Sequence, residues 1–493
     1  MGGRDGERSP REIPVSQETI GLVAAAAVLV VGTTLDPPPS LSVEGQRALA
    51  VFLSALALWL TRPVPYVVSS LCSVTLLFAL GAVDSFDAAT TGFTSTLVFF
   101  LLALLLLADA TTSVGLDRRL ARRLLSVDST PRRALQSVAG SVLALALVMP
   151  SAMARAVTFV PVVKRLAGAF GSGDDGFERA AFLVLGHVNP IASMALMTGG
   201  GMALVTSEIV ARSVRPITWV DWAVLMIPPT LVLYGLAAVA AGLFVRVDGE
   251  ATLDAAEGLR PDEADDAIPP TTDDGSRLEA DGDGPAALTR DQRLVGLVLC
   301  GAIAGWIAGS FVGLPTVLPA VAAVTALSVP PAGVITAEDI ADVNWGIVFL
   351  IGAMLSILDA METTGAIRAV IDVLTRWLPL EALAGWQVVA VLIALAVVIR
   401  VLFSTGSAAI VVALPIVLEL AAVFEINRLF LALTVLLVVG STTILPFNTT
   451  AVLVSMDRGP LSHRDVAAFG LVTMLLSAAV AALSWLIYWP LVT

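Results

Sequence analysis

Long apolar runs separated by short polar breaks dominate the chain. Within each run the apolar residues are continuous and do not alternate with polar ones, which argues against a membrane β-barrel. Most runs approach or reach the length of about 20 residues that a helix needs to cross a bilayer. The uninterrupted runs lie at 18–35, 43–61, 65–83, 94–114, 220–246, 292–311, 315–330, 344–361 and 466–491. The pattern predicts an all-α polytopic membrane protein with about 11 transmembrane segments.

Two further apolar regions, 134–168 and 385–423, each contain a short polar string that breaks a helix. The strings are PSAMAR at 150–155 and STGSA at 404–408, and a proline follows each of them. The apolar arm on either side of each string is short for a full crossing. Each region is therefore predicted to form a re-entrant helical hairpin with its polar string at the tip.

Two broken helices are predicted at 179–211 and 427–455. The first contains three consecutive glycines at 199–201, and the second contains the polar run NTT at 448–450. Backbone that is freed from helix hydrogen bonding in hydrocarbon must be buried in protein or line a wet cavity. Corresponding interruptions in two halves of a chain are the best sequence pointer to the binding site of a transporter.

Three pairs of short motifs recur in the same order in the two halves, with spacings that drift by only a few residues. The pairs are Asp109 with Gly115 and Asp359 with Gly365, residues 203–207 and 451–455, and Asp221 and Asp465. With an odd number of crossings between them, the repeats are predicted to be inverted, which is the architecture behind rocking or elevator-type alternating access. Chance similarity between apolar segments is the alternative explanation.

Composition agrees with a membrane protein, because 57% of the residues are hydrophobic, 14% are charged and the mean hydropathy is +0.90. The net charge of −13 is local, since thirteen acidic residues and two arginines between Asp248 and Asp283 account for −11 of it. This stretch, rich in Pro, Gly, Asp and Thr, is predicted to be a disordered cytoplasmic linker. The predicted divisions are a cytoplasmic tail at 1–17, a first membrane half at 18–246, the linker at 247–291 and a second membrane half at 292–493.

Arginine placement predicts the orientation in the membrane. Six arginines between positions 118 and 133 form the densest basic cluster, and short basic loops face the cytoplasm. The N-terminus and the mouth of the first hairpin are therefore predicted to be cytoplasmic. The C-terminus and the mouth of the second hairpin are predicted to be extracellular, in a multi-pass plasma membrane protein. Lys164 is the only lysine, and abundant Asp with scarce Lys is typical of halophiles, although GC-rich coding also favours Arg.

An anion that leaves water for the middle of a bilayer needs a replacement for its hydration. Helix N-termini provide unpaired N–H groups and partial positive charge, and the second arm of each hairpin begins near Ala152 or Gly406. Ser151, Thr405 and Ser407 add hydroxyl donors. Such residues also cap helix ends, and the two roles are compatible. A small anion between the two tips is the predicted substrate.

Arg155 and Arg400 lie near the hairpin tips within otherwise apolar sequence. An ionisable residue costs at least about 2.5–3.5 kcal/mol at the centre of a membrane helix, so each arginine should face a cavity or a partner. A guanidinium can grip a carboxylate or sulfate through two hydrogen bonds. It can also occupy a sodium site and make transport independent of sodium. For Arg400, a structural ion pair with Glu419 or Asp359 is the alternative.

His187 lies in the string GHVNP within a membrane segment, where it can either titrate and couple protons or form a packing hydrogen bond. An intramembrane serine protease would need Ser407 with His187 as its base, but the second glycine after the serine is missing. The sequence shows no Cys/His metal set, no phosphate-binding loop that ends in lysine and no basic patch for nucleic acid. The chain is therefore predicted to be no enzyme, to hold no cofactor and to bind no nucleic acid.

Taken in order, the motifs resemble those of the divalent anion:sodium symporter family. The resemblance rests on the string GFTS at 92–95, the two hairpin tips and the break LPFNT at 445–449, and it covers nearly all of the chain from Leu41 onward. It implies an elevator-type secondary transporter of di- or tricarboxylates or sulfate, coupled to Na⁺ and assembled as a homodimer. The string PSxxAR also resembles the tips of members that exchange citrate or dicarboxylates. Sodium-independent exchange and proton-coupled transport are therefore the alternatives.

The resemblance also implies roles for particular residues. In the family, a Ser-Asn-Thr motif at each tip contacts the substrate, and backbone from the broken helices completes two sodium sites. Neither tip of this chain keeps the Asn of that motif. With Arg155 added from its position, the predicted substrate-binding residues are Ser151, Ala152, Met153, Arg155, Thr405, Gly406, Ser407, Asn448 and Thr449. The predicted sodium ligands are Ser151, Gly199, Gly200, Thr405 and Asn448, with Arg400 and His187 as further intramembrane candidates.

Overall fold

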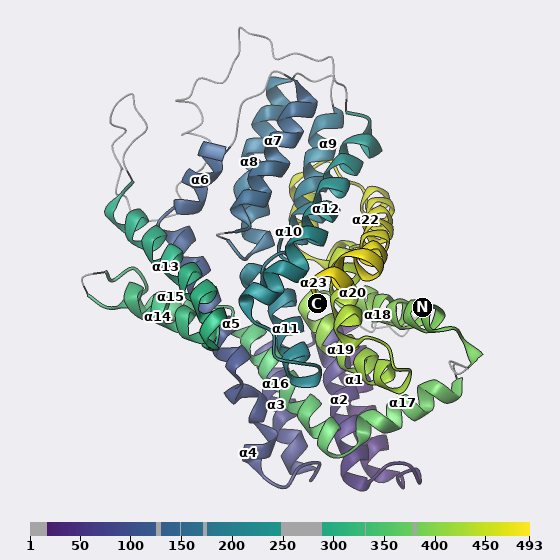
Figure 1. Cartoon of the computed structure of the whole chain (residues 1–493). Coiled ribbons are helices and arrows are strands. Elements are labelled where there is room, and N and C mark those ends of the chain that lie inside the picture. The colour runs from purple at the N-terminus through teal and green to yellow at the C-terminus, as the bar shows by residue number, and fades with distance from the viewer. Residues whose placement is uncertain are drawn as a thin grey trace, which may run out of the picture. The chain divides into compact units, whose positions relative to one another are not determined.

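The computed structural model describes residues 17–124, 130–147, 149–170, 175–247, 288–330, 332–377 and 382–493. Throughout these residues the regular secondary structure is helical, with no strand, as Figure 1 shows. Eight of the described helices are long and apolar enough to cross a membrane, and four shorter apolar helices accompany them. The prediction of an all-α polytopic membrane protein is confirmed. Most of the predicted acidic linker and of the predicted N-terminal tail lies outside the described residues.

The chain divides into two compact units, each discontinuous in sequence. The described helices of unit 1 are α1 (Gln17–Thr34), α2 (Val43–Thr61), α3 (Tyr66–Ala79), α4 (Phe86–Ala89), η1 (Thr91–Thr94), α16 (Trp345–Thr363) and most of α17 (Ala366–Trp377). Here α16 packs against α3 and η1. The amide of Gly92 donates to Ser356 Oγ at 3.0 Å, and a Cβ at Gly92 would lie 2.1 Å from the carbonyl oxygen of Gly352. The string GFTS therefore provides a close helix contact inside unit 1.

Unit 2 contains Ser95–Asn344 and Leu374–Thr493. Its first described helices are α5 (Thr96–Ser113), α6 (Leu116–Leu124), α7 (Pro131–Leu145), α8 (Ala152–Ala169), α9 (Asp175–Leu183), the π-helical turn η2 (Val184–Val188), α10 (Asn189–Ala192), η3 (Met197–Gly199), α11 (Gly201–Ser213) and α12 (Trp219–Val245). The later ones are α13 (Arg290–Val312), α14 (Val317–Ser328), α15 (Ala337–Asp342), α18 (Gly385–Leu402), α19 (Gly406–Val423), α20 (Arg428–Ser441), η6 (Pro446–Asn448), α21 (Thr450–Arg458), α22 (His463–Leu483), η7 (Ser484–Tyr488) and α23 (Trp489–Val492). All predicted site residues belong to unit 2.

Both predicted hairpins are present. Helices α7 and α8 pack side by side, as do α18 and α19 (Figure 1). The four arms have 15 to 18 residues, which corresponds to about 22–27 Å against a hydrocarbon core of about 30 Å. The lengths are compatible with arms that stop inside the membrane, and re-entry stays a prediction.

The repeated sequence motifs adopt the same local structures in both halves. Gly115 lies between α5 and α6 with φ of +66°, and Gly365 lies between α16 and α17 with φ of +75°. These values are in the left-handed region, which glycine tolerates without a steric penalty. Asp221 and Asp465 both occupy the third position of a helix and accept the amide of the N-cap residue in a capping box. The pairing of motifs in the sequence therefore reflects equivalent helix starts and ends.

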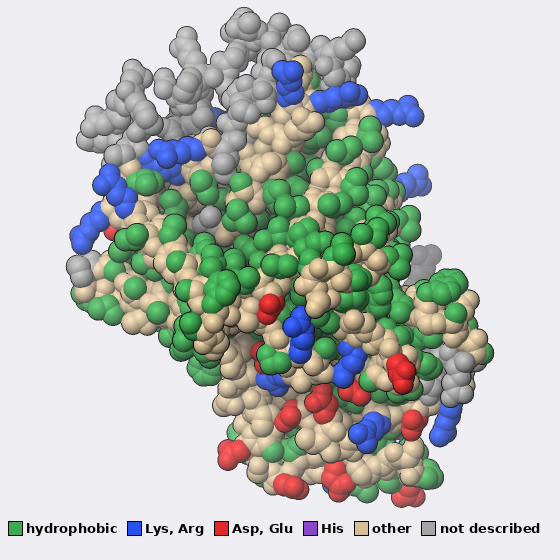
Figure 2. All heavy atoms as spheres, viewed as in Figure 1, with side chains coloured by type: hydrophobic (Ala, Val, Ile, Leu, Met, Phe, Trp, Pro, Cys, Tyr) green, Lys and Arg blue, Asp and Glu red, His purple; other side chains and the backbone are tan. Residues whose placement is uncertain are grey.

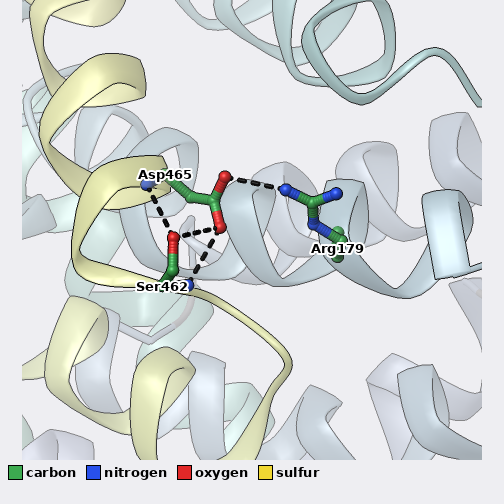
Figure 3. A network of polar contacts seen from close by, with 3 residues as sticks. All are labelled: Arg179, Ser462 and Asp465. Atoms are coloured by element: carbon green, nitrogen blue, oxygen red, sulfur yellow. Dashed lines mark hydrogen bonds and ion pairs between the residues drawn. The ribbon is translucent and has the colours of Figure 1, made fainter.

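The capping box of α22 also connects two helices of unit 2. Figure 3 shows Asp465 accepting hydrogen bonds from the backbone amide of Ser462 at 2.9 Å and from its hydroxyl at 2.7 Å. The other carboxylate oxygen of Asp465 lies 2.8 Å from Nη2 of Arg179 on α9. The broken helix of the first half is thereby tied to the last long helix of the second half.

The core of unit 2 is centred on α19 and α20. Thirteen residues of α19 are buried, and so is every residue of α20 from Leu429 to Ser441. Helix α20 packs against α19, α18, α11 and α22. A helix that is apolar on all sides is one that neighbouring helices enclose, which explains why the second hairpin and its broken helix form one packed group.

Candidate functional site

The two hairpin tips meet at the three consecutive glycines. A Cβ at Gly201 would lie 2.8 Å from Ser407 Oγ, at the tip of the second hairpin. A Cβ at Gly200 would lie 3.5 Å from the carbonyl oxygen of Pro150, at the tip of the first hairpin. A Cβ at Gly199 would lie 2.6 Å from the carbonyl oxygen of Ser193. A side chain at Gly201 would therefore clash with the second tip, and one at Gly199 would clash with the broken helix itself, whereas the first tip lies at an ordinary contact distance from Gly200.

Four helix N-termini belong to this region. Helices α8 and α19 begin at the hairpin tips, and α11 and α21 begin where the two broken helices resume. Helix α11 packs on α19, and α21 packs on α8, so each hairpin contacts the broken helix of the other half. A Cβ at Gly406 would lie 2.1 Å from Sδ of Met202 on α11. Helix N-termini carry free N–H groups and partial positive charge, which suits an anion.

The tip hydroxyls differ in what they bind. Ser151 Oγ accepts the amide of Ala154 at 3.2 Å and so caps α8. Thr449 Oγ1 likewise accepts the amide of Val452 at 3.1 Å and caps α21. Thr405 is the N-cap residue of α19 but makes no capping hydrogen bond with its side chain. Within the described residues the hydroxyls of Thr405 and Ser407 have no hydrogen-bond partner, so they are available to a ligand.

Arg155 is completely buried and connects the first hairpin to the first broken helix. Nε donates to Asn189 Oδ1 at 2.7 Å, and Nη2 donates to the Asn189 carbonyl at 3.2 Å and to Ser193 Oγ at 2.7 Å. Nη1 donates to the carbonyl oxygen of Met149 at the tip. Asn189 Nδ2 in turn donates to the carbonyl of Ala152 at 2.7 Å. One of the five N–H groups of a guanidinium is left for another partner.

Arg400 is also completely buried and connects the second hairpin to the second broken helix. It donates to three carbonyl oxygens, those of Val439 at 3.1 Å, Phe403 at 2.9 Å and Asn448 at 2.8 Å. The side-chain amide of Asn448 donates to Phe403 O at 3.0 Å and to Val401 O at 3.2 Å. Both N–H donors of the Asn448 side chain are therefore already hydrogen-bonded to the hairpin backbone.

Neither buried guanidinium has a carboxylate partner among the described residues. The alternative of an ion pair between Arg400 and Glu419, both in unit 2, is therefore wrong. Asp359 belongs to unit 1, where it accepts the Thr91 hydroxyl. Carbonyl oxygens satisfy the N–H donors but carry no net charge. The site thus contains two fixed positive charges that the described part of the chain does not neutralise.

The remaining predicted residues lie around this arrangement. Met153 is 47% exposed, while the carbonyl of Ala152 is already bound by Asn189. The ring of His187 packs edge-on against Phe469, and its Nε2 lies 3.2 Å from the carbonyl oxygen of Val466 on α22. His187 makes no hydrogen bond to Ser407 in the described structure, so no protease pair is formed there.

Sequence reasoning missed the partners of the arginines. Asn189 and Ser193 hold Arg155, and the carbonyls of Phe403 and Val439 hold Arg400. Only Asn189 gave a signal in the sequence, as an amide directly before a proline inside an apolar segment. Carbonyl acceptors belong to every residue, so a sequence cannot single them out.

Comparison with known proteins decides the family. The model described as the sodium:sulfate symporter transmembrane region matches residues 16–493. The chain belongs to the sodium:sulfate symporter family. A membrane protein of Cupriavidus necator is 26% identical over 500 residues, which cover 97% of this chain and 94% of that protein. The sodium:sulfate symporter family is one of transporters, which is not a class of enzymes.

Proposed function

We propose that this chain is a secondary transporter that carries a small divalent or multivalent anion, a di- or tricarboxylate first and sulfate second. One observation carries the proposal: two buried guanidinium groups without carboxylate partners flank the point where the hairpin tips meet. The family supports the general activity, because it transports anions together with sodium.

Charge balance is the physical reason. A buried, uncompensated charge in low dielectric is strongly unfavourable, and hydrogen bonds to neutral carbonyls relieve only part of that cost. An anion between the tips supplies the missing countercharge. The free hydroxyls of Thr405 and Ser407 and the helix N-termini then bind it directly, and the arginines act mainly through their field.

The proposed mechanism is elevator-type alternating access. Both hairpins, both broken helices and both arginines belong to unit 2, so the site can move as one body without being taken apart. Unit 1, which contains early helices of both halves, is the proposed scaffold and the proposed contact surface of a homodimer. Figure 2 shows Lys and Arg side chains gathered at the end of unit 2 where α7 begins and α8 ends, at the top of the view. This supports a cytoplasmic position for that end in a plasma membrane.

Sodium coupling is suggested by the family, but the oxygen atoms at the tips favour a second candidate. Sodium needs hard oxygen ligands such as carbonyls and hydroxyls. Arg155 already binds Met149 O, Asn189 O and Ser193 Oγ, and Arg400 already binds Asn448 O. A guanidinium at these oxygens repels a second cation. Of the five predicted sodium ligands, Asn448 alone is bound by an arginine, but the two fixed charges disfavour a cation near the tips. Sodium-independent exchange of anions is the coupling mode that these contacts favour.

Uptake of radiolabelled succinate, citrate and sulfate into proteoliposomes tests the proposal. We expect saturable uptake of at least one anion, stimulated by the same anion on the opposite side and unaffected when choline replaces sodium. Uptake that requires a sodium gradient would restore symport and remove the exchange mode. No uptake or exchange of any of the three anions by correctly inserted protein would contradict the substrate class.

A further inference from the structure

A groove lies between α7 and α12 in unit 2, away from the hairpin tips. Its volume is about 550 Å³, and most of its lining side chains are apolar. Val239 and Leu243, both on α12, are 60% and 68% exposed. Helix α12 is long and apolar enough to span a membrane, so we expect these exposed side chains, in its last two turns, to face hydrocarbon. An apolar surface of this kind is suited to an acyl chain.

The same groove is also lined by Arg132, at the start of α7, and by Arg246, directly after the end of α12. Arg132 uses Nε to hold the carbonyl oxygen of Val247 at 3.2 Å, which leaves its two terminal nitrogens for other partners. Among the described residues neither arginine has an acidic partner, and no acidic side chain lines the groove. The groove therefore combines an apolar floor with a cationic rim.

Arg246 occupies a position that glycine would suit better. It follows the last residue of α12 with φ of 59° and ψ of 56°, in the left-handed region, which is uncommon for residues with a Cβ. The turn is closed by the amide of Val247, which donates to the Gly242 carbonyl at 3.1 Å. Replacing Arg246 by glycine would thus remove a guanidinium without straining the backbone.

We propose that this groove binds an anionic phospholipid of the cytoplasmic leaflet, with the phosphate between Arg132 and Arg246 and an acyl chain along Val239 and Leu243. Basic pockets between membrane helices on the cytoplasmic side are suited to anionic headgroups. The Lys and Arg side chains gathered at this end of unit 2 in Figure 2 add to the attraction. The acidic stretch 248–283 would also be attracted to the rim, but its polar residues do not match the apolar floor.

Native mass spectrometry of the full chain in detergent tests this site, with dioleoylphosphatidylglycerol as the probe and dioleoylphosphatidylcholine as the neutral comparison. We expect preferential binding of phosphatidylglycerol. Each basic residue near an anionic headgroup raises the binding constant by a factor of about five, so the Arg132→Gln/Arg246→Gly variant should bind this lipid with an affinity about 30-fold lower. Arg133→Gln is the matched control. Arg133 neighbours Arg132 on the exposed side of α7 and does not line the groove, so its loss should change affinity less than twofold.

Thermal unfolding in lipid-free detergent separates binding from folding. Arg246→Gly should leave the unfolding temperature unchanged or raise it, because glycine relaxes the left-handed turn. Equal affinity of the double variant and the wild type for phosphatidylglycerol would overturn the proposal. So would equal binding of the two lipids. Binding that appears only after deletion of 248–283 would also overturn it, because the acidic stretch would then be the occupant.

Discussion

Each hairpin has one buried arginine near its tip, but the two arginines occupy different positions relative to the tip. In the first hairpin Arg155 lies just after the tip, on α8, and its Nε donates a hydrogen bond to the side-chain oxygen of Asn189 in the broken helix. In the second hairpin Arg400 lies before the tip, on α18, and donates to the backbone carbonyl of Asn448. The side-chain amide of Asn448 in turn donates to the carbonyl of Phe403 in the hairpin. Both arrangements bind a tip carbonyl with a guanidinium. The comparison indicates that the two halves share a buried positive charge and not a residue position.

The hairpins also differ in their hydroxyls. The first tip uses Ser151 to cap its own helix, whereas Thr405 and Ser407 at the second tip make no such bond within the described structure. The cap holds Ser151 Oγ against its own helix but leaves its O–H as a donor, whereas neither hydroxyl at the second tip is held by a cap. We expect the second hairpin to provide more direct contacts to the substrate, while the first contributes mostly through the charge of Arg155.

The largest expected effect comes from removing the charge at the first tip. Arg155→Gln should lower the initial rate of anion uptake by at least about 100-fold, the equivalent of about 3 kcal/mol in a barrier or binding step. It should also lower the unfolding temperature, because Asn189 and Ser193 lose their donor. Uptake in proteoliposomes and thermal unfolding measure the two. Lys164→Gln, an exposed cation on the same helix, is the control and should leave uptake within twofold.

At the second tip, Arg400→Gln should reduce uptake about 30-fold, with a smaller loss of thermal stability, because three carbonyl acceptors are affected instead of a network of four. The double variant with Arg155→Gln sharpens the comparison. If both charges act on one anion, the two losses measured together should differ from the product of the single losses. Strictly independent effects would indicate that the two tips do not share a substrate.

The hydroxyl difference predicts opposite outcomes for two serines. Ser407→Ala should raise KM about tenfold with little change in stability, because a hydrogen bond to a charged ligand is worth about 1.5–3 kcal/mol. Ser151→Ala should instead cost about 1 kcal/mol of unfolding free energy through loss of its cap, with KM changed less. Concentration dependence of uptake and denaturation separate the outcomes. The reverse pattern would make the first tip the direct binding surface.

The smallest effect concerns a buried carboxyl on α6 that contacts the first hairpin. Asp117, on α6, is 1% exposed, faces Thr158 on α8 at 3.5 Å and has an unpartnered Oδ1. Burial raises the pKa of this carboxyl above its ordinary value of 3.8. The folded state then binds more protons than the unfolded state above pH 3.8, so Asp117 lowers stability as pH rises through this window.

Asp117→Asn should therefore raise the unfolding temperature at pH 7, and the gain should shrink as the pH approaches 4. Unfolding followed over pH 4 to 8 measures this, with the exposed Asp457→Asn as the control for general charge effects. A gain that does not depend on pH would show that the pKa of Asp117 is the same in the folded and unfolded states.

The helix plan was predictable because the sequence carries its signals locally. The helix starts at Ala152 and Gly406, the left-handed turns at Gly115 and Gly365, and the capping residues Asp221 and Asp465 all depend on neighbours within a few residues. The two-unit division was not predictable, since it depends on which distant helices pack together. For the same reason Arg155 and Arg400 were found as candidates but their acceptors were not.

The buried guanidinium pair has an electrical consequence. Both groups stay protonated at all physiological pH values. In the proposed elevator mechanism an empty site would therefore move with two positive charges, and a dianion bound there would cancel them. Displacement of one charge across 100 mV changes the energy by about 2.3 kcal/mol, so the membrane voltage acts on the empty site and leaves the filled one almost untouched. Under voltage clamp in a planar bilayer, we expect a current when the empty transporter returns across the membrane. We expect no current when one dianion is exchanged for another.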